Sequence, residues 1–331
     1  MSFPSTLLPI VSEWYKANAW ENITSYVRRD DGSGIQITGR GRRTEVDEVT
    51  PSQANFTVTN DDDTFSFRKP TATNYNLVGQ NTPFRHRVRW LNEQFDRTVV
   101  DGIGTSTDGT VTWGMSGGTV PGDYDVTSGA AVISLASVNV ARVIGCTPAK
   151  PIHDVTMVVD TNVSPATGAA IQARAGFSTS NSSFNNSYYA GVLFQTDGTM
   201  TVRIVKVIAG SSTTLVADTE VGFYTSGEVW TVRFKRWPGG YFGVMASSNA
   251  VNSIQPTGWT IYTTTPDTSY SAADLDSLIL LGRAETGNTN ASPTVSFNSV
   301  ELNSYRHWGE APSWEPDADS TGEDKFVHIQ S

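Results

Sequence analysis

Short runs of alternating apolar and polar residues, rich in valine, isoleucine, threonine and aromatic side chains, make up most of this 331-residue sequence. Side chains alternate between the two faces of a β-strand, so such runs predict strands with one buried face. The alternation is clearest in two stretches, whose predicted buried residues are Met200, Val202 and Ile204, and Trp230, Val232 and Phe234. No stretch sustains the period of an amphipathic helix. The pattern therefore predicts an all-β protein.

Turn signals separate these runs at regular intervals. The signals are Asp31-Gly32, Asp108-Gly109, Ser128-Gly129, Asp197-Gly198 and Pro238-Gly239-Gly240. We predict three segments: residues 1–92, residues 93–303, and residues 304–331, of which the last is punctuated by proline and tryptophan. The spacing of the strands in the middle segment is typical of a β-sandwich or jelly roll.

The net charge of −10 is unevenly distributed. Residues 1–92 carry 11 basic and 10 acidic residues, whereas residues 93–331 carry 12 basic and 23 acidic ones. An acidic surface repels phosphate backbones, so nucleic-acid binding is not expected. No apolar run approaches the ~20 residues of a membrane span, and residues 1–6 lack the basic and apolar regions of a secretory signal. The single cysteine, Cys146, excludes an internal disulfide and is expected to be a small buried apolar residue.

The middle segment resembles the concanavalin-like and laminin-G-like jelly rolls. The motifs that carry the resemblance are FDR at 95–97, IGTS at 103–106, VTW at 111–113, YFGV at 241–244 and VSFNSVEL at 295–302. In that fold the first and last strands lie side by side, so the domain can be inserted into a loop of another domain. The resemblance implies a jelly roll over residues 93–303, inserted between two halves of a second domain.

The flanking segments resemble the hub-type minor tail proteins of tailed bacteriophages of the siphophage kind. In residues 1–92 the resemblance rests on VRRDDGSGIQITGRGR at 27–42, PSQANFTVTNDDD at 51–63 and GQNTPFRHRVRW at 79–90. In the return segment, RHWG at 306–309 is followed by Trp314, Asp317 or Asp319, Gly322 and Asp324. The resemblance implies a β-barrel-like tail-hub domain that is interrupted by the jelly roll and resumed at the C-terminus.

A structural role follows from this resemblance. It implies a non-enzymatic minor tail protein of the virion, assembled in the host cytoplasm as a homotrimer around the tail axis. Its implied partners are the distal tail ring, the tape measure protein and tail fibres, with the jelly roll presented to fibres or host-surface glycans. Two alternatives stay open. One is a distal tail protein that forms a hexameric ring, and the other is a secreted carbohydrate-binding or hydrolytic jelly-roll protein that acts as a monomer.

Acidic residues that could serve catalysis are few. Glycosidases need two carboxyl groups about 5–10 Å apart that face one cleft. The closely spaced pairs, Asp123 with Asp125 and Asp274 with Asp276, lie beside turn-forming residues. We therefore predict no catalytic residue.

Metal ligands are equally sparse. The oxygen-rich stretch 60–63 lacks the spacing of a calcium loop and predicts a solvated turn. The jelly-roll family often carries a calcium ion near its rim, and the resemblance implies Asp96, Asp101 or Asp108 as ligands of such an ion. The sequence does not select among them.

Glycan binding is a further hypothesis. Residues 178–189, STSNSSFNNSYY, are polar, rich in amides and contain aromatic residues. Sugars are bound by amide and hydroxyl groups together with an aromatic ring on the apolar sugar face, so Phe184, Asn185, Asn186 and Tyr188 are candidates. An ordinary exposed loop is the alternative interpretation. Trp237, before the 238–240 turn, is either a fifth contact residue or a cap on the core.

Six arginines of the first segment are candidates for a subunit interface: Arg40, Arg42, Arg43, Arg85, Arg87 and Arg89. Alternation places the last three on one strand face, and such a row is costly to bury without partners. We expect it to meet solvent or acidic groups. In a symmetric ring, Glu45, Asp47 and Glu48 of a neighbouring subunit could supply them.

Overall fold

The computed structural model describes residues 10–17, 19–28, 35–37, 54–66, 69–75, 77–78, 81–116, 121–127, 129–135, 139–148, 153–165, 171–237, 239–248, 259–271, 273–310, 313–318 and 324–330. Of residues 19, 37, 88–90, 121, 303–310, 313–318 and 324–330 it describes the backbone alone. The chain divides into two compact units, residues 1–89 with 304–331 and residues 90–303. Within these ranges the elements are strands and one short 3-10 helix, Pro121–Asp123, and no helix has the length and apolar character to cross a membrane.

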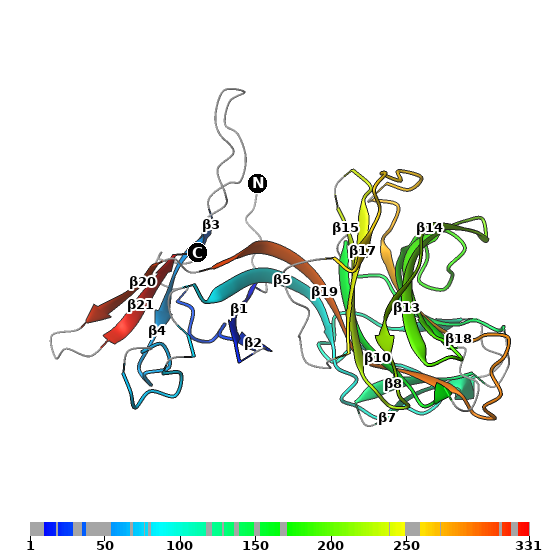
Figure 1. The fold of residues 1–331 in the computed structure, drawn as a ribbon, viewed down its shortest axis with the longest axis horizontal. Coiled ribbons are helices and arrows are strands. Elements are labelled where there is room, and N and C mark those ends of the chain that lie inside the picture. The colour runs from blue at the N-terminus through cyan, green and yellow to red at the C-terminus, as the bar shows by residue number, and fades with distance from the viewer. Residues whose placement is uncertain are drawn as a thin grey trace. The chain divides into compact units, whose positions relative to one another are not determined.

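Residues 90–303 form an antiparallel sandwich of two sheets, the arrangement of concanavalin-like jelly rolls (Figure 1). The first sheet has the order β17-β16-β15-β10-β19, and β8 and β7 join it through β19. Its strands are β7 (Tyr124–Thr127), β8 (Ala130–Ser134), β10 (Asp154–Thr161), β15 (Trp230–Arg236), β16 (Phe242–Ser247), β17 (Ile261–Tyr262) and β19 (Thr294–Glu310).

The second sheet has the order β14-β13-β12-β11-β18-β9-β6. Its strands are β6 (Gly114–Ser116), β9 (Arg142–Cys146), β11 (Ile171–Ser178), β12 (Ser187–Phe194), β13 (Thr199–Ile208), β14 (Ser211–Phe223) and β18 (Ser277–Ala284). Four of them, β11 to β14, follow one another as a meander. The sheet is therefore built largely from neighbours in sequence.

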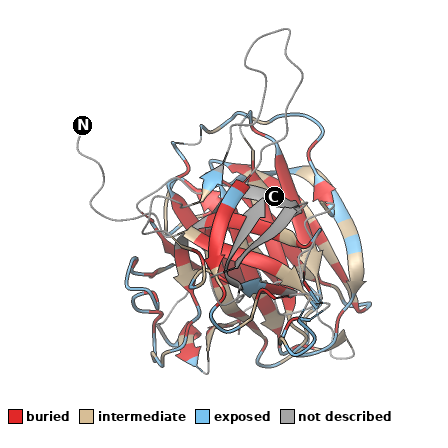
Figure 2. Ribbon diagram, turned by 90° about the vertical axis from the view of Figure 1, so that its left-hand side faces the viewer, coloured by how far each residue is buried: buried red, intermediate tan, exposed pale blue. Residues whose placement is uncertain are grey.

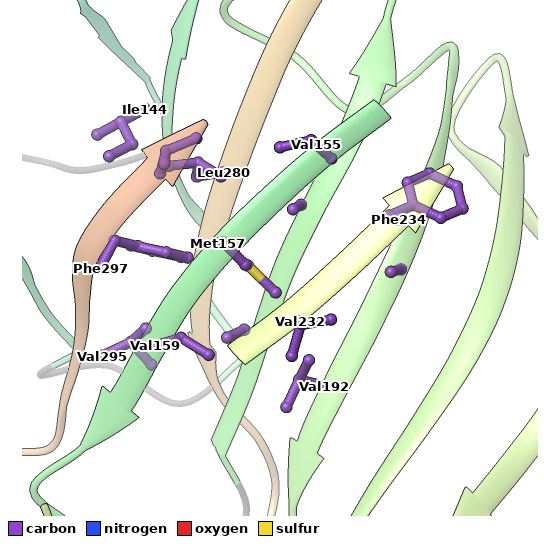
Figure 3. Packing of buried hydrophobic residues seen from close by; sticks show 14 of the residues in the cluster. Ile144, Val155, Met157, Val159, Val192, Val232, Phe234, Leu280, Val295 and Phe297 are labelled. Atoms are coloured by element: carbon purple, nitrogen blue, oxygen red, sulfur yellow. The ribbon is translucent and has the colours of Figure 1, made fainter. Parts of the chain in front are cut away.

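One apolar core fills the space between the two sheets. Figure 3 shows side chains from both sheets gathered there, among them Met157 of β10 and Val192 of β12. Phe234 stacks on Phe177 across the core, with ring centroids 4.8 Å apart. Buried residues follow most of the strands and many connections are exposed (Figure 2), whereas β14 at the sheet edge is largely exposed. Each buried side chain of this size stabilises the fold by about 1.5–3 kcal/mol, so the core holds both outer faces in fixed positions.

The other unit is assembled from both ends of the chain. Its strands are β1 (Ile10–Lys16), β2 (Ala19–Asn22), β3 (Gln36–Ile37), β4 (Ala54–Thr59), β5 (Pro83–Glu93), β20 (Ser313–Ala318) and β21 (Asp324–Gln330). They pair in the orders β5-β1-β2 and β20-β21-β4-β3. Strand β21 lies beside β4 (Figure 1), and their register places Phe326 opposite Thr59. A separate cluster around Trp14, Phe56 and Phe84 forms the core of this unit.

The observed architecture matches the predicted fold class. The chain is all-β, and the six residues predicted to be buried by alternation are at most 2% exposed in the sandwich core. Cys146 is also buried, and burial, followed by the charges of Glu93 and Asp108, raises the pKa of its thiol. The first boundary between the units falls after residue 89, three residues before the predicted one and within β5.

Candidate functional site

Trp237 lies on the outer face of the first sheet and is paired with Trp259. The two rings meet edge to face, with centroids 4.6 Å apart and planes at 77°. Both rings lie over Gly243 of β16, where an added Cβ would be 2.7 Å from Trp237 and 2.8 Å from Trp259. Phe242 and Val244 point into the core, so position 243 faces outward. The glycine leaves the room that the two indole rings occupy.

Cross-strand pairing adds a tyrosine to the same surface. Asp154 of β10 lies opposite Lys235 of β15, Lys235 lies opposite Gly243, and Gly243 lies opposite Tyr262 of β17. Directly opposed residues share a face, so Tyr262, which is 59% exposed, stands on the face that carries the tryptophans. We call this surface the tryptophan face; it consists of Asp154, Arg233, Lys235, Trp237, Trp259 and Tyr262 around Gly243.

A buried ion pair anchors the charged side of the tryptophan face. Arg233 Nε and Nη2 donate to the two carboxylate oxygens of Asp154 at 2.8 and 2.6 Å, and the side chains are 4% and 3% exposed. Lys235 Nζ lies 3.9 Å from Asp154. Burial lowers the pKa of Lys235, the attraction of Asp154 opposes this shift, and the repulsion of Arg233 reinforces it.

Both cations also contact the aromatic rings. The Arg233 guanidinium lies 5.3 Å from the ring centroid of Trp259, and Lys235 Nζ lies 5.7 Å from that of Trp237. Cation–π attraction and bidentate pairing hold these groups in defined positions. The surface thus combines half-buried indole rings with fixed charges, and the ammonium group of Lys235 can donate hydrogen bonds to a ligand. Such a surface can stack on the apolar face of a polar ligand and bind its edge.

The predicted glycan-binding loop is not a free aromatic surface. Phe184 is 8% exposed and belongs to a second apolar cluster on the outer face of the second sheet, together with Tyr189 and Ile279. The loop backbone folds onto that sheet, because the carbonyl oxygen of Asn181 would lie 2.2 Å from a Cβ on Gly145. The prediction of Phe184 as a sugar-stacking residue is therefore wrong, since an apolar cluster takes up its ring.

Tyr188 is also buried, which corrects the same prediction. It is fully buried in the sandwich core, and its ring packs 4.3 Å from Phe242. Its hydroxyl donates to Asp267 at 2.5 Å. Asn186 already binds within the chain, because its side-chain oxygen accepts hydrogen bonds from Tyr270 Oη and the Ala209 N–H, both at 2.9 Å.

Asn185 and Trp237 complete the set of predicted glycan-binding residues. Asn185 is exposed, and its backbone oxygen accepts from the Gly210 N–H at 2.9 Å. Trp237 is half-buried on the tryptophan face and is not part of the sandwich core. The interpretation of Trp237 as a cap on the core is therefore wrong, because its ring packs on the opposite side of the sheet.

Two of the predicted interface arginines are buried within the chain. Arg85 and Arg87 are 4% and 1% exposed. Arg85 Nε donates to Glu13 at 2.6 Å, and Arg87 Nε and Nη2 donate to the same carboxylate at 2.9 Å. Burial raises the pKa of Glu13, but the hydrogen bonds and charges of Arg87 and Arg85 outweigh it and lower the pKa to about 2.

The prediction that these two arginines form a subunit interface is therefore wrong. Strand β1 is antiparallel to β5 and places Glu13 directly opposite Arg85, so the acidic partner comes from the same chain. Arg40, Arg42, Arg43 and the acidic residues at 45, 47 and 48 lie outside the described residues. Of Arg89 only the backbone in β5 is described.

Two of the three acidic candidates for a calcium site serve local structure. Asp96 accepts from Thr107 Oγ1 at 2.9 Å, and Asp108 accepts from Ser106 and Thr110. Among the residues that the structure describes, no group of three His, Cys, Asp or Glu side chains could hold a metal ion. The stretch 60–63 forms the predicted turn, with Asp61 and Asp62 exposed.

In each of the two acid pairs considered for catalysis, the two carboxylates bind different local partners. Asp123 pairs with Arg142 at 2.9 Å, whereas Asp125 accepts from the Asp101 N–H. Asp274 accepts from the Ser271 N–H, and Asp276 accepts from Ser277 Oγ.

Sequence reasoning missed most of the tryptophan face. The alternation in 229–237 already placed Arg233 and Lys235 opposite the buried residues, and that signal could have marked them as outward-facing. Trp259 is 22 positions from Trp237 in the sequence and is brought to it only by the pairing of β16 with β17. Gly243 carries no local signal beyond lacking a side chain.

Comparisons with known proteins find no family for this chain. The chain matches no protein-family model and no curated protein. Similar solved structures include a non-specific endo-β-1,3(4)-glucanase of family GH16, with 9% identity, 66% of this chain and 92% of that chain covered, and a TM-score of 0.43. The carbohydrate-binding module CBM66 from Bacillus subtilis has 14% identity, coverages of 57% and 94%, and a TM-score of 0.37.

A legume lectin-like domain from Entamoeba histolytica is a third, with 9% identity, coverages of 60% and 89%, and a TM-score of 0.41. At these identities the similarity concerns the fold alone, and folds of this kind carry enzymes and non-catalytic binding proteins alike. The jelly roll is defined by the strand order and core of residues 90–303, and its chemistry depends on its own side chains.

Proposed function

We propose that this protein is a carbohydrate-binding jelly-roll protein that holds a glycan on the tryptophan face without hydrolysing it. The observation that carries the proposal is the Trp237–Trp259 pair over Gly243, beside the exposed Tyr262. Neither tryptophan belongs to the core clusters of the described residues. Aromatic rings outside the core with a polar rim suit a ligand that has one apolar and one polar side.

Sugars have this two-sided chemistry. The C–H groups of a pyranose ring form an apolar face that packs on an indole, and its hydroxyl groups accept hydrogen bonds from an ammonium such as that of Lys235. The Asp154 carboxylate is engaged by two N–H groups of Arg233, so it is poorly placed to act as a general acid or nucleophile. Binding is therefore favoured over hydrolysis.

The first experiment screens the full chain against immobilised neutral oligosaccharides and measures affinities for the best ligand by calorimetry. We expect Trp237→Ala and Trp259→Ala each to weaken binding about tenfold, or ~1.4 kcal/mol, because each removes a stacking ring. Phe223→Ala is the matched control, since Phe223 is 71% exposed on β14 of the second sheet. If no neutral glycan binds, or if both tryptophan variants bind as the unchanged protein does, the proposal fails.

A second candidate function is a minor tail protein of a bacteriophage tail tip, in which the same jelly roll would face host glycans. The observation that favours it is the unit made from both ends of the chain, with β21 of the return segment paired to β4. A tail hub interrupted by an insert requires that the segments before and after the insert pair in one sheet. Electron microscopy of the purified protein tests it: a ring of three subunits supports the hub, six subunits support a distal tail protein, and a monomer contradicts both.

A further inference from the structure

Three arginines project from the outer face of the second sheet, on the opposite side of the sandwich from the tryptophan face. Arg174 of β11 and Arg203 of β13 stand on either side of Gly191 in the strand register. Arg283 of β18 is directly opposite Gln172 of β11. The residues that alternate with them point into the core. We call Gln172, Arg174, Arg203 and Arg283 around Gly191 the arginine face.

The guanidinium groups of this face lie close enough to influence one another. Arg203 leans over Gly191, where an added Cβ would be 3.2 Å from its Cγ. The Arg174 guanidinium lies on the ring of Tyr189, 4.4 Å from the centroid. Burial, together with the charges of Arg203 and Arg283, outweighs the opposing effects of Tyr189 and Glu285 and lowers the pKa of Arg174 to about 10. It therefore remains charged at neutral pH, and the face keeps three positive charges.

Acidic side chains balance these charges only in part. Arg203 Nη1 lies 3.7 Å from Asp218, whose side chain is 43% exposed, and Arg283 Nη2 lies 3.2 Å from Glu285. The longer pair, with its exposed Asp218, interacts weakly. Arg174 donates from Nε at 2.7 Å to an amide oxygen, that of Gln172, and no carboxylate within the described ranges pairs with it. The face has a surplus of positive charge.

The same face holds buried donors that lack an acceptor. Gln172 is fully buried, and its Nε2 has no hydrogen-bond partner among the described residues. The Nε atoms of Arg203 and Arg283 are also buried and have no hydrogen-bond partner among the described residues. Unpaired buried donors are rare in folded proteins because they have lost water without gaining an acceptor. Three of them on one face of the sheet indicate a place where an acceptor binds.

We propose that the arginine face binds an oxyanion group, a carboxylate or a phosphate, carried by an acidic glycan. The planar fork of arginine N–H groups matches both groups. Residues 93–331 carry 23 acidic and 12 basic residues, so the surrounding surface repels anions and binding depends on this local patch. The inference rests on the proposed function for one point only, that the ligand is a glycan, and it uses a separate set of residues.

The test titrates the full chain at low salt, by calorimetry, with three polysaccharide probes: polygalacturonate, poly(glycerol phosphate) and neutral dextran. We expect one or both acidic polymers to bind and dextran not to bind at this face; the two acidic arms decide between carboxylate and phosphate. The double variant Arg203→Gln and Arg283→Gln should bind the acidic polymer at least about tenfold more weakly. Asp218→Asn with Glu285→Gln should bind it severalfold more tightly, because the competing carboxylates are gone.

Control variants distinguish binding at the arginine face from binding at the tryptophan face. Trp237→Ala with Trp259→Ala should leave binding of the acidic polymer unchanged, so failure at one face is distinguishable from failure at the other. Unchanged affinity in the arginine double variant overturns the inference. So does binding of poly-L-glutamate as tightly as the acidic polysaccharides, since the face would then be a docking surface for acidic protein. Thermal unfolding checks that the variants fold, and Arg283→Gln alone, at a side chain 29% exposed, gives the same test with less perturbation.

Discussion

The two outer faces of the sandwich cover the same core, but they differ in how their charged side chains are paired. On the tryptophan face, Asp154 and Arg233 form a bidentate pair that is almost completely buried, and aromatic rings contact the cations. On the arginine face, Arg174 has an amide partner in place of a carboxylate, and several N–H groups have no acceptor in the described structure. One surface holds a complete buried ion pair, and the other does not.

This difference bears on how each face would recognise a ligand. A surface whose carboxylate is already paired offers apolar rings and the Lys235 donor, so its ligand can be neutral. A surface with unpaired donors and surplus positive charge gains most from a ligand that brings acceptors. The two faces of one jelly roll thus suit two parts of a glycan, one neutral and one acidic.

The largest expected effect compares the ion pairs of the two faces. Asp154→Asn removes the charge that Asp154 supplies to the buried Arg233 and should lower the free energy of unfolding by about 3–5 kcal/mol. Asp218→Asn removes a long, exposed contact to Arg203 and should change it by less than about 0.5 kcal/mol. Denaturant unfolding of both variants measures the difference. Equal losses of unfolding free energy in the two variants would show that burial does not make the Asp154 pair stronger than the Asp218 pair.

The buried ion pair of Glu13 with Arg85 and Arg87, in the other unit, is a reference for the Asp154 pair, because no ligand is proposed to bind near it. The folded-state pKa of Glu13 is about 2, against an ordinary value of 4.5. Its contribution to stability, about 3 kcal/mol, is therefore present above pH 4.5 and lost as the pH falls from 4.5 towards 2. Hydrogen exchange of β1 and β5 across this range should show the loss, and Glu13→Gln should show little pH dependence there.

The smallest expected effects come from the two central glycines. Gly243→Ala places a methyl group within 3 Å of both indole rings and should cost about 1–3 kcal/mol while weakening neutral-glycan binding. Gly191→Ala meets only the flexible side chain of Arg203 and the edge of Tyr189, and should be neutral or stabilising by up to about 1 kcal/mol. Thermal unfolding with glycan titration measures both, and a larger loss at Gly191 would reverse the proposed order.

Strand alternation was enough to predict the fold class and the buried sides of individual strands. Trp230, Val232 and Phe234 all face the core because a strand has a period of two, which is a local property. Which strands become neighbours is not local. Glu13 meets Arg85 because β1 pairs with β5 in one particular register, and a shift of one residue would have turned the arginine away.

The candidate site depended on such long-range pairings even more. The aromatic composition of 178–189 suggested an exposed contact loop, yet alternation at Tyr188 also fits a core strand, and the core takes its ring. Phe184 is buried by a cluster that forms only when the loop folds onto β9 and β18. Trp237 remained as a surface candidate because a glycine on the neighbouring strand leaves space for its ring, a fact that no single stretch of sequence reveals.

The pairing of β4 with β21 has a consequence for how the molecule is made. Thr59 and Phe326 are directly opposite each other, so a ribosome must translate more than two hundred intervening residues before the first can find the second. Contacts of such long sequence separation form slowly, and domains tend to fold in the order of synthesis. The sandwich, whose meander strands are near neighbours, can be complete while the unit formed from the two ends still lacks its closing strand.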